Sequence, residues 1–214
     1  MMGGTMFEAM REAMVDSQLR PTGVNDPALL AAIRSVPRER FVPPPRAALA
    51  YSDTAIELAP GRWLLEPLIT ALLLTHARIA PTDRVLVVGA GTGYAATVIA
   101  RLTPHVTALE EDAGLAMAAA ANGVEVVTGP LAEGWAAAAP YDLIFIDGAA
   151  AVLPPLLLAQ AAPGGRLAVV IIGDDGIGRA TVGRIASAHF AGTGFIETGA
   201  VVLPGFGRAP AFVF

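Results

Sequence analysis

The stretch Val85-Leu86-Val87-Val88-Gly89-Ala90-Gly91-Thr92-Gly93-Tyr94 decides the fold. Its four leading apolar residues show no polar alternation, which is typical of a strand buried on both faces of a parallel sheet. The three glycines that follow form a turn, because glycine adopts positive φ and lets a ligand approach the backbone. We expect a helix from Tyr94 to Leu102, whose N-terminus favours an anionic group. The stretch therefore predicts a strand, a glycine turn and a helix.

The chain beyond this stretch alternates between predicted strands and helices. Further strands are expected at 106–109, 124–128, 143–146 and 167–172, and an alanine-rich helix at 113–121 ends at Asn122-Gly123. Residues 195–202 and 211–214 are candidates for an antiparallel edge. Such alternation predicts an α/β fold with a Rossmann-like, doubly wound, mostly parallel sheet, which binds ligands at the carboxyl ends of its strands.

The N-terminal third has a different pattern, of helices and loops. Helices are predicted at 7–19, from Pro27 after a cap at Asn25 or Asp26, and at 67–78. Pro37 and the run Pro43-Pro44-Pro45 flank an irregular stretch between them. We expect one domain over 1–214, with a helical N-terminal extension at 1–80 and the Rossmann-like core at 81–214.

Composition excludes several classes of protein. The 214 residues are 54% hydrophobic and carry a net charge of −5, so neither disorder nor a nucleic-acid partner is expected. There is no cysteine, and all 14 basic residues are arginine, which excludes thiolate sites and lysine chemistry. The most apolar region, 149–162, is interrupted by prolines, whereas a membrane span needs about 20 apolar residues. Residues 1–14 lack the pattern of a signal peptide, so a cytoplasmic location is expected.

The spacing of the glycines narrows the choice of ligand. Dinucleotide-binding proteins carry glycine or alanine at the sixth position of G-x-G-x-x-G, where this chain has Tyr94. The spacing G-x-G-x-G suits S-adenosyl-L-methionine instead. Glu110, at the end of the next predicted strand, is placed to accept hydrogen bonds from both ribose hydroxyls. The alternative is a glycine turn required only for tight packing.

Most of the chain resembles the protein-L-isoaspartate O-methyltransferases, which are class I S-adenosylmethionine enzymes. The matching pieces are Met14-Val15-x-x-Gln18-Leu19, Val36-Pro37-Arg38-x-x-Phe41-Val42-Pro43, Ala50-Tyr51-x-Asp53, the glycine stretch, Gly134-Trp135, Pro140-Tyr141-Asp142 and Pro163-Gly164-Gly165-Arg166-Leu167. The resemblance implies a seven-stranded sheet, S-adenosyl-L-methionine as cofactor, and methylation of a carboxylate in a damaged protein or peptide. It implies a cofactor site made of Gly89, Ala90, Gly91, Thr92, Gly93, Glu110, Glu111, Gly129, Pro130 and Leu131.

The loop that should hold the methyl acceptor departs from the family pattern. Family members carry Gly-Gln-Thr-Ile-Ser-Gln-Pro, and the aligned stretch here is Gly61-Arg62-Trp63-Leu64-Leu65-Glu66-Pro67. Trp63 and Leu65, which replaces the serine, are expected to line the acceptor site. Arg62 is a candidate bidentate clamp for the acceptor carboxylate, or alternatively a solvated surface arginine.

Three further positions differ from the family. Val87 and Pro130 stand where the family usually has acidic residues. Because proline has no backbone N–H, the N–H of Leu131 is the donor left to meet the adenine ring. Asp147 is an acidic residue at a position where the family pattern has none. It is expected either to orient or deprotonate an acceptor, or to cap the following helix.

Other titratable residues carry less of a signal. The three histidines are scattered and are expected to be structural, and Asp174-Asp175-Gly176 is expected to form a turn before a helix, so no metal site is predicted. Two other functions stay open: methylation of another acceptor with Asp147 as base, and a cofactor-binding protein without catalysis.

Overall fold

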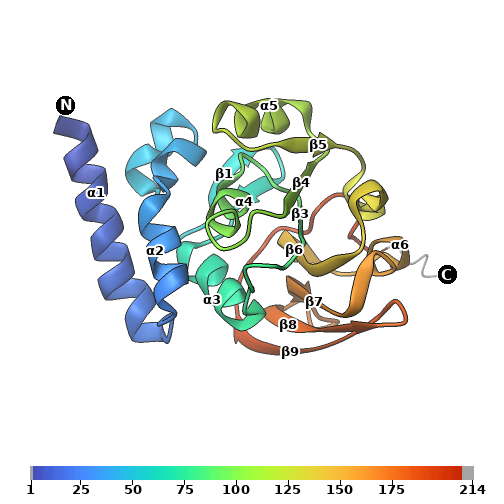
Figure 1. The fold of residues 1–214 in the computed structure, drawn as a ribbon. Helices are drawn as coiled ribbons and strands as arrows, with labels where there is room; N and C mark the ends of the chain where they lie inside the picture. The colour runs from blue at the N-terminus through green and yellow to red at the C-terminus, as the bar shows by residue number, and fades with distance from the viewer. Residues whose placement is uncertain (1, 209–214) are drawn as a thin grey trace.

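The computed structural model describes residues 2–208 and consists of a central sheet flanked by helices (Figure 1). The helices are α1 (Met2–Met14), α2 (Pro27–Ser35), α3 (Pro67–Ala77), α4 (Tyr94–Ile99), α5 (Ala113–Ala121) and α6 (Pro155–Leu158). The strands are β1 (Ile56–Ala59), β2 (Arg62–Leu64), β3 (Val85–Val88), β4 (Val106–Glu110), β5 (Val126–Thr128), β6 (Tyr141–Ala150), β7 (Ala161–Ile172), β8 (Gly178–Ala186) and β9 (His189–Glu197). No helix in this range is long and apolar enough to cross a bilayer.

The main sheet has seven strands in the order β5-β4-β3-β6-β7-β8-β9. The five strands β5, β4, β3, β6 and β7 pair parallel with one another, and Val85 lies opposite Val106 on one side and Leu143 on the other. All four residues of β3 are buried, as an apolar run without alternation predicts. The predicted Rossmann-like, mostly parallel sheet of seven strands is confirmed.

The antiparallel edge lies elsewhere than predicted. β8 pairs antiparallel with both β7 and β9, so the three strands form a meander. The predicted strand at 195–202 is wrong, because only 195–197 belong to β9. The predicted strand at 211–214 lies outside the described residues. The predicted helix after Asp174-Asp175-Gly176 is wrong, because β8 follows this turn directly. β8 and β9 are joined by a hairpin turn at Ser187 and Ala188, both with positive φ, and these residue types do not signal such a turn.

The core lies on both faces of the sheet. Val85 and Val87 face a cluster shared with α2, α3 and α4, whereas Leu86 and Val88 face a second cluster that includes Leu157. In Figure 1, α1 is outermost and α2 lies between it and the rest of the molecule. Asp26 begins α2 as predicted, because its carboxylate accepts from Leu29 N at 2.8 Å.

Two features outside the main sheet position the site. β1 and β2 form a separate two-stranded hairpin, whose turn contains Gly61 at φ +72°. Near the end of the described chain, residues 201–203 return to β6: Ala149 N donates to Val201 O at 3.1 Å and Leu203 N to Ala149 O at 2.9 Å. Both segments reach the carboxyl ends of β3 and β6, where the strand order reverses and where ligands bind in such sheets.

Candidate active site

The glycine loop between β3 and α4 has left-handed backbone at all three glycines, with φ of +74° at Gly89, +56° at Gly91 and +95° at Gly93. A Cβ on Gly93 would lie 2.5 Å from Val124 Cγ2, so packing alone requires that glycine. A Cβ on Gly89 would lie 2.7 Å from Leu203 Cδ1, and a Cβ on Gly91 would lie 3.0 Å from Leu58 Cδ1, so packing restricts these two glycines as well. The packing alternative therefore accounts for all three glycines in this conformation, and the ligand interpretation stays a prediction.

Glu110 ends β4 and is completely buried. Its Oε2 accepts from Gly91 N at 2.7 Å, and its Oε1 accepts from the backbone N–H groups of Glu111 at 2.9 Å and Asp112 at 3.0 Å. The carboxylate therefore lies beside the glycine loop, as the sequence predicts, and holds that loop to the start of α5.

Arg62 forms a bidentate ion pair with Glu110. Its Nη1 donates to Oε1 at 2.5 Å and its Nη2 to Oε2 at 2.6 Å. The residue is only 6% exposed, so the alternative of a solvated surface arginine is wrong. β2 carries Arg62 over the ends of the parallel strands, where it meets a carboxylate of the protein itself. Its role as a clamp for an acceptor stays a prediction.

Asp147 lies inside β6 and is 4% exposed. Its Oδ1 has no hydrogen-bond partner among the described residues. Burial raises the pKa of Asp147 to about 7, although the charges of Arg38 and Arg62 oppose the change. The helix-cap interpretation is wrong, because β6 continues to Ala150 and Pro154 precedes α6.

Arg38 is a buried cation that sequence reasoning left without a role. Its Nε donates to Ala50 O at 2.8 Å and its Nη2 to Leu65 O at 2.5 Å, and its guanidinium lies 4.6 Å from the centroid of the Tyr94 ring. Burial lowers the pKa of this arginine. Arg38 therefore fixes the backbone of the acceptor loop. Its place in the Val36-Pro37-Arg38 motif was the signal that pointed to it.

The predicted acceptor residues Trp63 and Leu65 lie together. They line a cavity of about 330 Å³, together with Ala55, Gly61, Gly148, Gly199, Ala200, Val201 and Leu203. The lining is almost wholly apolar apart from backbone, and Gly148 is the neighbour of Asp147. The cavity therefore joins the acceptor loop to the end of β6.

The remaining predicted cofactor residues follow β4 and β5. Leu131 N, expected to meet an adenine ring, donates to Glu111 Oε2 at 3.2 Å. Gly129 N donates to the backbone oxygen of Glu110 at 3.3 Å, and Pro130 precedes the short 3₁₀ turn Leu131–Glu133. Val87 is buried within β3, Ala90 is buried, and Thr92 donates to Phe41 O at 2.6 Å. Glu110, Glu111 and the 129–131 turn thus form one hydrogen-bonded group.

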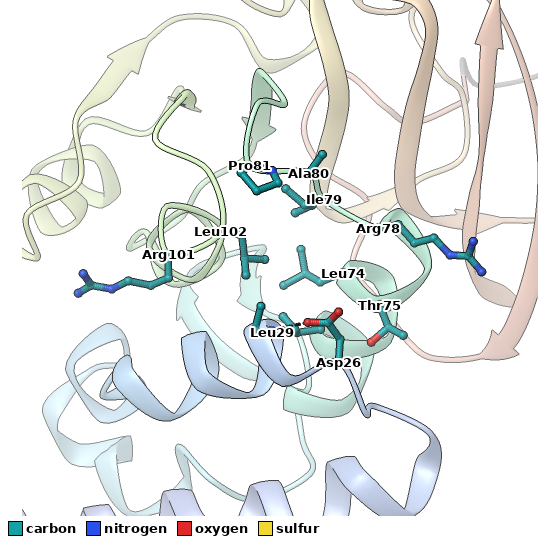
Figure 2. Close-up of a pocket in the computed structure, with 11 residues that line it drawn as sticks. Asp26, Leu29, Leu74, Thr75, Arg78, Ile79, Ala80, Pro81, Arg101 and Leu102 are labelled. Carbon is teal, nitrogen blue, oxygen red and sulfur yellow. Dashed lines mark hydrogen bonds between the residues drawn. The ribbon is translucent and has the colours of Figure 1, made fainter.

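A larger cavity, of about 640 Å³, lies away from these residues (Figure 2). It is bounded by α2, α3 and the 78–81 segment, and Figure 2 shows Arg78 and Arg101 pointing away from it in opposite directions. Two of its polar lining residues are engaged with their own helices: Asp26 accepts from Leu29 N, and Thr75 donates to Ala71 O. Within 2–208 no three His, Cys, Asp or Glu residues cluster as metal ligands, and His76 stacks on Phe195.

Comparison with known proteins identifies the family. The family model described as protein-L-isoaspartate(D-aspartate) O-methyltransferase matches residues 9–182. A protein-L-isoaspartate O-methyltransferase of Rhodopseudomonas palustris is 42% identical over 169 residues, which cover 76% of this chain and 77% of that protein.

Two solved structures share the fold. One, a protein-L-isoaspartate O-methyltransferase, has a TM-score of 0.76 at 24% identity and covers 93% of this chain and 66% of its own. A Plasmodium falciparum chain solved with S-adenosyl-L-homocysteine has a TM-score of 0.75 at 17% identity and covers 92% of this chain and 97% of its own. The resemblance seen in the sequence is confirmed, and the chain belongs to the protein-L-isoaspartate(D-aspartate) O-methyltransferase family.

Proposed function

We propose that this protein is an S-adenosyl-L-methionine-dependent O-methyltransferase that methylates the carboxylate of isoaspartyl residues in damaged proteins or peptides. The observation that carries the proposal is the family match over 9–182, which includes both the glycine loop and Glu110. The apolar cavity beside Trp63 and Leu65 supports an acceptor site next to that loop.

The cofactor supplies a methyl group on a sulfonium centre, and the residues present fit it only in part. The glycine loop offers close backbone approach at the point where the strand order reverses, which suits the cofactor. Glu110 does not fit as it stands, because the Arg62 guanidinium and three backbone N–H groups already occupy its oxygens. In this conformation the site does not accept the nucleoside.

The acceptor carboxylate needs hydrogen-bond donors more than a base. A carboxylate is ionised near neutral pH, and burying it without partners is costly. Because burial raises its pKa to about 7, Asp147 is protonated below neutral pH and about half protonated at pH 7. The protonated carboxyl then presents an O–H donor one residue before Gly148, which lines the cavity, instead of a repelling charge. Buried Arg38 adds positive charge nearby, and its Nη1 has no partner among the described residues. We assign Asp147 to orienting the acceptor, in place of the serine that Leu65 replaces.

One observation favours a second candidate function. The Arg62–Glu110 ion pair occupies the position expected for the ribose, which would suit a protein that binds the cofactor weakly and does not transfer its methyl group. Transfer of methyl groups separates the two candidates.

The test is transfer of tritiated methyl from S-adenosyl-L-methionine to an isoaspartyl peptide. The matched control is the same peptide with an ordinary aspartyl linkage. We expect a base-labile methyl ester on the isoaspartyl peptide alone, and its loss in the Glu110→Ala variant. Equal labelling of both peptides contradicts the isoaspartyl assignment. No labelling of any peptide or protein pool favours the second candidate.

A further inference from the structure

The acceptor capacity of Glu110 is fully used. An ionised carboxylate has about four lone-pair sites. Arg62 donates two hydrogen bonds to it, and the backbone of Gly91, Glu111 and Asp112 donates three more. Two ribose hydroxyls can bind this carboxylate only if another donor leaves. The backbone donors belong to the loop and the start of α5, so the side chain of Arg62 is the donor that can leave.

The crevice between β3 and β6 is also filled from within. Leu203 lies between the two strand ends: a Cβ on Gly89 would be 2.7 Å from its Cδ1, and a Cβ on Gly148 would be 2.7 Å from its Cδ2 and Cγ. The same Gly89 position is 3.5 Å from Arg62 Nη2, and Leu58 Cδ1 lies 3.0 Å from the corresponding position of Gly91. Side chains from the β1–β2 hairpin and the 201–203 segment therefore cover both glycines.

The hairpin that carries Arg62 and Leu58 forms its own two-stranded sheet, outside the ladders of the main sheet. β1 and β2 pair only with each other, and Gly61 with its left-handed backbone directly precedes Arg62. Moving the Arg62 side chain breaks no ladder of the seven-stranded sheet. The hairpin backbone is anchored in the core by Ile56 and Leu64, which are 1% and 2% exposed, whereas the guanidinium of Arg62 is held by the ion pair with Glu110.

We infer that Arg62 is a built-in competitor of the nucleoside for Glu110, and that the β1–β2 hairpin closes the cofactor site until the guanidinium is displaced. This inference rests on the proposed use of an adenosyl cofactor. When only a fraction of molecules is open, the apparent dissociation constant equals the intrinsic value divided by that fraction. Removing the competitor therefore tightens nucleoside binding, although Arg62 lines the site.

The test is calorimetric titration with S-adenosyl-L-homocysteine of the wild type, Arg62→Gln and Arg62→Lys. Glutamine cannot form the bidentate ion pair, and lysine keeps the charge with a single nitrogen. We expect at least about tenfold tighter binding in Arg62→Gln and an intermediate affinity in Arg62→Lys. The matched control is Arg46→Gln, which breaks the exposed 3.5 Å pair between Arg46 and Glu57 of the same hairpin and should leave the affinity unchanged.

The possible outcomes separate this inference from the proposed function. Binding that is equal to or weaker than wild type in the Arg62 variants overturns the inference, while measurable binding by the wild type leaves the proposed function standing. No binding by any of the proteins overturns both. If circular dichroism shows that Arg62→Gln is unfolded, Arg62→Lys decides by the same criterion, because it retains a cation opposite Glu110.

Discussion

Replacing Asp147 with asparagine should stabilise the protein in a pH-dependent manner. The carboxyl is 4% exposed and its Oδ1 lacks a hydrogen-bond partner within the described part of the chain, so ionising it in the folded state is costly. Asparagine has nearly the same shape and stays neutral at every pH. It therefore resembles the protonated form of Asp147.

The magnitude follows from the pKa of Asp147, which burial raises from an ordinary 3.8 to about 7. The folded state holds this proton more tightly than the unfolded chain does. The wild type therefore keeps its full stability below pH 3.8 and loses stability as the pH rises from 3.8 to about 7. Since one pKa unit corresponds to about 1.4 kcal/mol, the loss totals roughly 4 kcal/mol.

Urea denaturation of both proteins across this pH range provides the assay. We expect the Asp147→Asn variant to match the wild type near the acid end and to gain roughly 4 kcal/mol in free energy of unfolding above neutral pH. Parallel stability curves for the two proteins would refute the argument, since they would mean that Asp147 titrates alike in the folded and unfolded chain.

Three other substitutions test separate parts of the structure. Arg38→Met leaves the carbonyls of Ala50 and Leu65 unpaired in the core, so the free energy of unfolding measured in urea should fall by about 3 kcal/mol; an unchanged value would contradict a structural role. Gly93→Ala brings a methyl 2.5 Å from a methyl group of Val124 and should cost about 3 kcal/mol by thermal denaturation, against about 1 kcal/mol for Gly123→Ala, where φ is +84° and the space is open. Trp63→Ala enlarges the apolar cavity and should raise KM for an isoaspartyl peptide about tenfold with a smaller change in kcat, as initial rates will show.

Local patterns predicted the parallel half of the sheet well. The apolar run at 85–88 marks β3 because a strand buried on both faces cannot tolerate polar residues. The meander was missed because β8 and β9 are only partly buried and contain glycines, so neither shows an uninterrupted apolar run. β6 was predicted too short because Asp147-Gly148 looks like the end of a strand.

The sequence placed individual residues of the candidate site near the strand ends, but it did not indicate how they pair. Glu110 follows from its place at the end of a strand, and Trp63 and Leu65 from the aligned loop. The ion pair between Arg62 and Glu110 joins residues 48 positions apart, through a hairpin that packs over the sheet. Leu203 fills the crevice from a still more distant segment. No local sequence pattern encodes such contacts, because tertiary packing alone decides them.

The order of the strands also bears on how the molecule folds. Successive hairpins connect β7, β8 and β9, so these strands pair at a small cost in loop-closure entropy. β3 and β6 instead pair although two other strands and their helices lie between them in the sequence. Residues 201–203 then bond to β6 from near the end of the described chain. Contacts of long sequence separation form late in folding. The buried strands β3 and β6 should nevertheless have the strongest amide protection from solvent exchange, because core strands open only with the whole domain. We expect weak protection at 201–203 instead, where Val201 is 42% exposed, so that this segment detaches from β6 without disrupting the sheet.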